Sequence, residues 1–260
     1  MADLHIQGIR LSFAGIVALD GVSLEVPAGT LQAVIGPNGA GKTSLFNCIS
    51  GVYRPQQGSV RFGEHDLLGR PPHQVAGLGV ARMFQNLAVF PQLTTLENLL
   101  LGRHHAWGAS FLQDLMWTKT ARRKEVEHRR RAEEVIDFLN LERYRKTPAG
   151  ILPYGVLKRV ELGRALCMDP KLLLLDEPAA GLNQEETEDM ARYLLDIKEE
   201  LGISLVLIEH NLGLVMDLAD SVVVLDFGRR IAGGTPDEVA SDPAVLEAYT
   251  GRSATQEASA

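Results

Sequence analysis

A glycine-rich segment, Gly36-Pro-Asn-Gly-Ala-Gly-Lys42-Thr43, lies between an apolar run at 31–35 and a helical pattern that begins near residue 42. Glycines at this spacing let the backbone turn tightly and point several N–H groups toward one centre, where they can bind phosphate oxygens. The first turn of the following helix adds partial positive charge there. The segment therefore predicts a strand, a phosphate-binding loop and a helix in succession, and it restricts the chain to α/β folds built around such a loop.

Short apolar runs alternate with helical patterns along much of the chain, which is typical of α/β folds. The runs at 31–35, 172–175 and 204–208 are apolar without alternation, as expected for strands that are covered on both faces. Helices are expected near 42–50, 184–201 and 211–219. The expected strands cover 4–9, 22–26, 31–35, 59–62, 80–84, 172–175, 204–208 and 221–225.

The middle of the chain, from about 94 to 168, has almost no strand pattern and contains helical patterns at 94–106, 121–141 and 155–168. We interpret it as a helical subdomain inserted into the α/β core. One domain is expected over 1–252, and residues 253–260 are expected to form a disordered tail. A basic run at 119–131 is interleaved with glutamates, which favours a solvated helix face with ion pairs. Attraction to anionic lipid headgroups is the alternative for this run.

Composition limits the classes of function. The chain has 260 residues, of which 45% are hydrophobic, enough for a sizeable core. The net charge of −7 argues against general nucleic-acid binding, which usually needs a basic surface. Cys48 and Cys167 lie in helical patterns and are expected to be buried thiols. The first residues lack a signal-peptide pattern, and no apolar run approaches the roughly 18 residues that span a bilayer.

Four residues carry the expected chemistry. Lys42 would reach the β- and γ-phosphates of a nucleotide, and Thr43 would coordinate Mg²⁺. The second apolar run ends in Asp176 and Glu177, at the edge of a parallel sheet where ligand sites form. Asp176 would hold Mg²⁺ through water, and Glu177 would orient or deprotonate the attacking water.

With both motifs, the chain resembles the nucleotide-binding subunits of ABC transporters over nearly its whole length. It is most similar to the branched-chain amino-acid importer ATPases, in their larger subunit, through the segments at 90–99 and 177–183 and the ending at 248–251. The resemblance implies a P-loop core of the ABC ATPase type with an inserted helical subdomain and an antiparallel β portion near the N-terminus. It also implies ATP and Mg²⁺ as cofactors.

The resemblance implies further site residues. Phe13 matches the aromatic that stacks on adenine, and Gln85 resembles the Q-loop glutamine that links the Mg²⁺ site to the transmembrane partner. His210 resembles the switch histidine that contacts the γ-phosphate. Thr43, Gln85 and Asp176 would form the metal site. The nucleotide would also contact Gly36, Pro37, Asn38, Gly39, Ala40, Gly41, Lys42, Thr43 and Ser44, and Tyr154 and Gly155 of the signature motif.

Two motifs depart from the family pattern. Asn183 stands where the D-loop commonly ends in Asp. The signature motif contains Pro153 in place of the usual serine, so a hydroxyl that elsewhere bonds the γ-phosphate of the opposite subunit's ATP is missing. The helix that follows still resembles the signature helix.

The resemblance implies a head-to-tail dimer with a second ATPase subunit, either a second copy or a related chain, that sandwiches two ATP molecules. Integral-membrane permease subunits would be direct partners and an extracytoplasmic solute-binding protein an indirect one. The chain would lie peripherally at the cytoplasmic face of the plasma membrane. An exporter motor, a soluble ABC ATPase and a P-loop kinase or GTPase are the alternatives; the kinase or GTPase would not need the signature helix or the Glu177–His210 pair.

Overall fold

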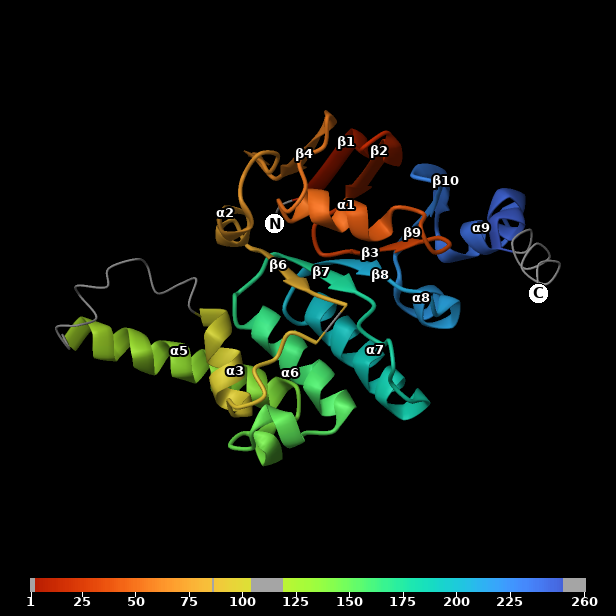
Figure 1. The fold of residues 1–260 in the computed structure, drawn as a ribbon. Helices are drawn as coiled ribbons and strands as arrows, with labels where there is room; N and C mark the ends of the chain where they lie inside the picture. The colour runs from red at the N-terminus through yellow and green to blue at the C-terminus, as the bar shows by residue number, and fades with distance from the viewer. Residues whose placement is uncertain (1–2, 86, 104–118, 250–260) are drawn as a thin grey trace.

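The computed structural model describes residues 3–85, 87–103 and 119–249, without the side chains of 119–122. Two sheets form its framework (Figure 1). The first is antiparallel, with the order β2-β1-β4-β5. Its strands are β1 (Leu4–Phe13), β2 (Ile16–Val26), β4 (Gln57–Phe62) and β5 (His65–Asp66). This antiparallel portion near the N-terminus confirms that part of the expected fold class.

The second sheet has six strands in the order β10-β9-β3-β8-β7-β6. All neighbours pair in parallel except the edge strand β10, which is antiparallel to β9. The strands are β3 (Leu31–Ile35), β6 (Val80–Met83), β7 (Leu172–Asp176), β8 (Ser204–Ile208), β9 (Ser221–Asp226) and β10 (Arg229–Gly234). Every residue of β3, β7 and β8 is buried, which confirms that these strands are covered on both faces.

Alternate residues of the parallel strands belong to different cores, because successive side chains of a strand point to opposite faces. Leu172 and Leu174 pack with α1 (Lys42–Ile49) and the antiparallel sheet. Leu173 and Leu175 pack with α6 (Tyr154–Leu166), α7 (Gln184–Glu199) and α8 (Leu212–Leu218). Figure 1 shows α1 between the two sheets. The phosphate-loop helix is thus enclosed by both sheets.

Where it is described, the segment 94–168 consists of helices and turns, and its strand pairing is limited to an isolated bridge between Thr94 and Pro148. It contains α3 (Thr95–Gly102), α5 (Lys119–Phe138), the 3₁₀ turns η2 (Glu142–Tyr144) and η3 (Ala149–Ile151), and α6. The three expected helical stretches are confirmed, although 104–106 lie outside the described residues. That the segment forms an inserted subdomain stays a prediction, as does the domain boundary at 252. The expected tail also lies outside the described residues.

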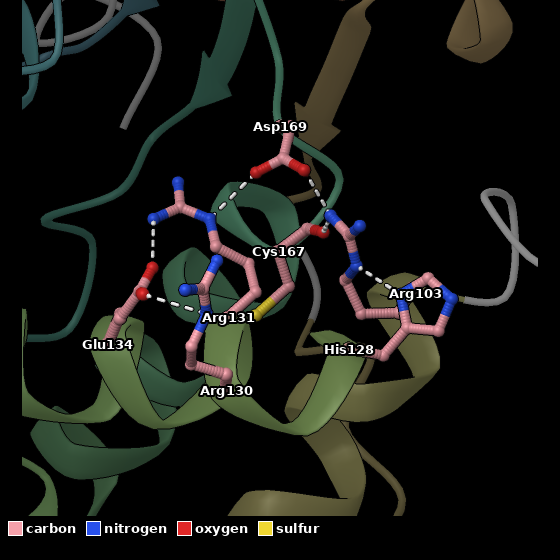
Figure 2. A network of polar contacts seen from close by, with 7 residues as sticks. All are labelled: Arg103, His128, Arg130, Arg131, Glu134, Cys167 and Asp169. Atoms are coloured by element: carbon pink, nitrogen blue, oxygen red, sulfur yellow. Dashed lines mark hydrogen bonds and ion pairs between the residues drawn. The ribbon is translucent and has the colours of Figure 1, made fainter. Parts of the chain in front are cut away.

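A partly buried polar network attaches α5 to its neighbours (Figure 2). Arg103 donates from Nη1 to the carbonyl of Cys167 at 2.7 Å and also pairs with Asp169. Arg131 of α5 donates from Nε to Asp169 Oδ1 at 2.7 Å. Arg103 Nε donates to His128 Nδ1 at 3.1 Å, so this ring nitrogen must lack a proton. The expected basic run is therefore only partly a solvated face, because His128 and Arg131 turn inward.

Several short elements were not expected, among them α2 (Pro72–Gly77), α9 (Pro236–Ala240) and β10. Both helices are shorter than two turns, too short to show a helical period. The sequence of β10 does not alternate between apolar and polar residues. This strand forms through its pairing with β9 across the Phe227–Gly228 turn. Both cysteines are buried, as expected, and burial raises the pKa of each thiol to about 12. No helix in the described ranges is long and apolar enough to cross a membrane.

Candidate functional site

The phosphate loop requires glycine at two positions. Gly36 has φ +146°, and a Cβ there would lie 2.0 Å from the carbonyl oxygen of Leu225. Gly41 has φ +101°, and a Cβ there would lie 2.6 Å from the carbonyl oxygen of Ala18. Any side chain at either place would collide with the backbone of a neighbouring segment. The loop therefore lies in close contact with β2 and with the end of β9, and these contacts fix its backbone conformation.

Lys42 begins α1, with Gly41 at the N-cap position. Its Nζ donates to the carbonyl oxygens of Gly36 at 2.7 Å and Pro37 at 3.1 Å, so the ammonium group lies within the loop. Burial lowers the pKa of Lys42, and the nearby carboxylates of Glu177 and Asp176 oppose this effect. A phosphate group would offer this ammonium a charged acceptor in place of the two neutral carbonyl oxygens.

A cavity of about 310 Å³ opens over the loop. It brings together the phosphate loop, Gln85 after β6, Glu177 after β7 and His210 after β8. Such convergence follows from parallel strands, whose carboxyl ends lie at one edge of the sheet. The sequence did not suggest Ala18 of β2, which also lines the cavity. The lining residues are Ala18, Asn38, Gly39, Ala40, Gly41, Lys42, Thr43, Ser44, Gln85, Glu177 and His210.

Glu177 lies between Gln85 and His210 at the cavity wall. Gln85 donates from Nε2 to Glu177 Oε2 at 3.0 Å. The Nε2 atom of His210 is 2.9 Å from Glu177 Oε1. Glu177 has φ +53°, which is uncommon outside glycine, and its backbone N–H donates to the carbonyl of Ile208 at 2.9 Å. The strained backbone places an ionisable carboxylate at the cavity with both oxygens in hydrogen-bond reach of neighbours.

Asp176 is the last residue of β7 and is only 1% exposed. Its Oδ2 accepts a hydrogen bond from Arg82 Nη2 at 2.7 Å, whereas its Oδ1 is buried with no hydrogen-bond partner among the described residues. Burial raises the pKa of Asp176, and the Arg82 guanidinium opposes this effect. A buried carboxylate oxygen without a partner is costly unless a cation or water meets it. This orphaned oxygen fits a Mg²⁺ site.

The three residues expected at the metal differ in their position relative to the cavity. Thr43 and Gln85 line the cavity, whereas Asp176 is buried directly before Glu177 in the chain and does not line it. Mg²⁺ usually retains several waters, so a carboxylate set back from the cavity wall is compatible with contact through water.

Two residues that support the site were missed by sequence reasoning. Glu209 is 4% exposed and accepts from the backbone N–H of Ala179 at 3.0 Å and of His210 at 3.0 Å. It therefore ties the turn after Glu177 to the start of the His210 loop. The second residue is Arg82, the partner of Asp176. Neither Glu209 nor Arg82 belongs to a sequence motif. Only their contacts in the folded structure identify them as residues that support the site.

The signature residues do not reach this cavity. The helix α6 begins at Tyr154, with Pro153 in an extended conformation as its N-cap. Tyr154 donates from its hydroxyl to the carbonyl of Ala180 at 3.3 Å. A Cβ on Gly155 would lie 2.2 Å from Glu186 Oε1. Both residues therefore contact the segment that leads into α7 and the first turn of that helix, rather than the phosphate loop of their own chain.

Asn183 has a structural role that the sequence did not suggest. Its side chain accepts from the N–H of Glu186 at 3.0 Å, and the Glu186 carboxylate accepts from the N–H of Asn183 at 3.1 Å. This reciprocal pair is a capping box at the start of α7. Asparagine satisfies the same backbone donors as aspartate would.

Phe13 ends β1 and is 45% exposed. Its ring meets that of Tyr53 edge to face, with 5.0 Å between centroids. Phe13 does not line the cavity described above, so its contact with adenine stays a prediction. The sequence did not suggest Tyr53, which supports one edge of the Phe13 ring and leaves much of it accessible.

Known families and proteins match nearly the whole chain. A family model described as ABC transporter matches residues 19–180, and one described as branched-chain amino acid ATP-binding cassette transporter matches 229–255. BraF of Pseudomonas aeruginosa, a high-affinity branched-chain amino acid transport ATP-binding protein, is 39% identical over 95% of this chain and 97% of its own length. LivG of Escherichia coli K12, described in the same words, is 36% identical over the same shares.

Solved structures agree with these matches. A crystal structure of the ADP conformation of an ATP-binding cassette from an ABC transporter is 36% identical, with a TM-score of 0.84. It covers 96% of this chain and 99% of that one. A nucleotide-free cassette from an ABC transporter, also 36% identical, has a TM-score of 0.83 over the same shares. The expected P-loop fold of the ABC type is therefore confirmed.

Proposed function

This chain belongs to the ABC transporter family of ATPases, and from that premise we propose that it drives a membrane importer for branched-chain or related amino acids. The observation that carries the proposal is the cavity in which Lys42, Gln85, Glu177 and His210 meet over the phosphate loop. The match at 229–255 to a branched-chain amino acid cassette family supports the substrate class, as do the relatives that span almost the whole chain.

The cavity residues can divide the work of ATP hydrolysis. The loop N–H groups and Lys42 would hold the phosphates and neutralise their charge. Glu177 would accept a proton from the attacking water, because its carboxylate is at the cavity and can accept. Gln85 and His210, each bonded to one oxygen of Glu177, would orient this carboxylate and then contact the water and the γ-phosphate.

Thr43, Gln85 and the orphaned Oδ1 of Asp176 are the residues that would hold Mg²⁺. When bound, this ion would neutralise charge that develops on the β- and γ-phosphate oxygens. The protein's contribution is to keep Asp176 oriented, as its bond to Arg82 does. Phe13 would supply a ring face for the adenine.

The position of the signature residues supports a split site. Tyr154 and Gly155 contact the segment before α7 instead of the phosphate cavity of their own chain. They would therefore cover the ATP of a second ATPase subunit in a head-to-tail dimer, with either a second copy or a related chain as partner. Permease subunits would bind this dimer at the cytoplasmic face of the membrane, and a solute-binding protein would act through them.

The test is to purify the tagged chain from detergent-solubilised membranes of its own source and to identify what accompanies it. We expect permease subunits and a second ATPase. After reconstitution with the binding protein, leucine or valine should stimulate ATP hydrolysis, whereas lysine should not. A chain that purifies without any membrane protein would favour a soluble ABC ATPase, and net export from the same vesicles would favour an exporter.

A further inference from the structure

The Arg82 side chain bonds the end of β7 and also the helix α1 that follows the phosphate loop. Arg82 lies on β6, three residues before Gln85, and its side chain is only 7% exposed. Nη2 donates to Asp176 Oδ2 at 2.7 Å, while Nη1 donates to Asn47 Oδ1 at 2.6 Å and to Ser50 Oγ at 3.3 Å. The guanidinium thus joins the strand that ends in Asp176 to the helix that begins at Lys42.

Sheet register explains why these groups meet. In the parallel pairing of β6 with β7, Arg82 is opposite Leu174. Side chains two residues apart in a strand share a face, so Asp176 points to the same side of the sheet as Leu174. That side is covered by α1, which carries Asn47. The Arg82 guanidinium also lies 5.6 Å from the ring centroid of Phe46 and 4.8 Å from that of Phe84. These contacts leave it little freedom to move.

A carboxylate held by one oxygen has its second oxygen fixed in direction. Arg82 occupies Oδ2 of Asp176, and Oδ1 is the buried atom that has no hydrogen-bond partner among the described residues. Partners of this kind, which contact a metal ligand and not the metal, commonly set metal affinity. The planar fork of arginine suits this task, because one nitrogen can bond Asp176 while the other is anchored on α1.

We propose that Arg82 is the positioning residue that holds Asp176 with Oδ1 turned toward the divalent cation of bound nucleotide. The inference rests on the proposed function, since it assumes that Asp176 serves the cation. Arg82 contacts neither the cation nor the phosphates and acts only through Asp176. Its removal should therefore weaken binding of the cation much more than binding of the nucleotide alone.

The test uses the full chain saturated with a fluorescent, non-hydrolysable ATP analogue, with Mg²⁺ titrated and fluorescence recorded. Arg82→Gln retains a donor but loses the charge and the fork, and the half-saturating Mg²⁺ concentration should rise by about 10- to 100-fold. Affinity for the analogue in EDTA should stay within about twofold, since the phosphate loop is unchanged. The matched control is Arg145→Gln, which removes the pair between Arg145, in the segment between α5 and α6, and Glu133 of α5, and should leave both values unchanged.

Two further variants keep the test decisive. If Arg82→Gln does not fold, Arg82→Lys takes its place, because it keeps the charge but cannot bond Asp176 and Asn47 together; it should raise the half-saturating concentration by less, in the same direction. Adding Arg82→Gln to Asp176→Asn should cause no further rise. Folded Arg82 variants with unchanged Mg²⁺ dependence, or additive effects in the double variant, would overturn the inference. If Asp176→Asn alone changes nothing, the fault lies in the proposed site itself.

Discussion

Glu177 Oε1 and His210 Nε2 lie 2.9 Å apart, although 33 residues separate them in the chain. The contact forms because β7 and β8 are neighbouring parallel strands that end side by side, with Asp176 paired to Ile208. The other oxygen of Glu177 accepts from Gln85. One carboxylate is therefore held between the two residues that follow its neighbouring strands.

Glu177→Gln should abolish most turnover and leave ATP binding intact. An amide cannot accept a proton from water, and loss of a general base typically lowers the rate by about 10²- to 10⁴-fold. The trapped ATP should also hold the dimer closed, which size-exclusion chromatography with ATP would detect. His210→Ala should likewise bind ATP and hydrolyse it slowly. A Glu177→Gln protein that is monomeric with ATP and turns over normally would contradict the assignment.

Lys42→Ala should weaken ATP binding by about 10- to 100-fold, as expected when hydrogen bonds from a charged donor worth about 1.5–3 kcal/mol are lost. Equilibrium titration with a fluorescent ATP analogue would measure this. Lys146→Ala is a suitable control, because Lys146 is exposed and lies in the segment between α5 and α6. Equal affinities of the two variants would argue against the phosphate site.

Stability should fall on acidification through His128. Burial and the Arg103 guanidinium lower the pKa of His128 in the folded protein, so the unfolded state binds a proton first. The contribution of this residue is complete above its unfolded pKa, about 6.5, and is lost as the pH falls below that value. His128→Asn offers an acceptor that does not titrate. Its melting temperature should therefore fall less than that of the wild type between pH 7.5 and 5.5. Parallel falls would exclude His128 as the cause.

The chain purified alone should be largely monomeric and a slow ATPase, because Tyr154 and Gly155 lie away from the phosphate cavity of the same chain. ATPase rate per molecule should rise with protein concentration or on addition of the second ATPase subunit. Rapid, saturable turnover at low concentration without a partner would exclude the split site.

Pro153→Ser should raise the ATPase activity of the assembled complex or leave it unchanged. Serine restores a hydroxyl that could reach the partner's ATP, and α6 now lacks any side-chain cap at this position. A serine cap would also stabilise the helix by about 1 kcal/mol. If the partner is a different ATPase, the ATP bound to the partner is covered by this chain's signature motif. That ATP should be hydrolysed more slowly than the ATP bound to this chain. A complex that assembles but loses activity would show that proline is required.

Local spacing in the sequence encodes the elements of this fold that could be predicted. The glycine spacing at 36–41, the uniformly apolar runs that form β3, β7 and β8, and the polar residues that end those runs all depend on neighbours a few positions away. Backbone conformation and burial period are local properties, so Lys42, Asp176 and Glu177 can be predicted as site residues from the sequence alone. Short elements such as α2 and α9 escape prediction because they hold too few residues for a period.

Which side chains meet depends instead on the packing of distant segments. The bond between Arg82 and Asp176 spans 94 residues, and the bond from Ala179 to Glu209 spans 30. Both depend on the order β8-β7-β6 at one edge of the sheet, which no local pattern encodes. The contacts of Tyr154 with the segment before α7 depend likewise on how α6 packs. A charged residue that becomes buried needs a partner, and this need follows from its chemistry alone. Strand order and register decide which residue that partner is.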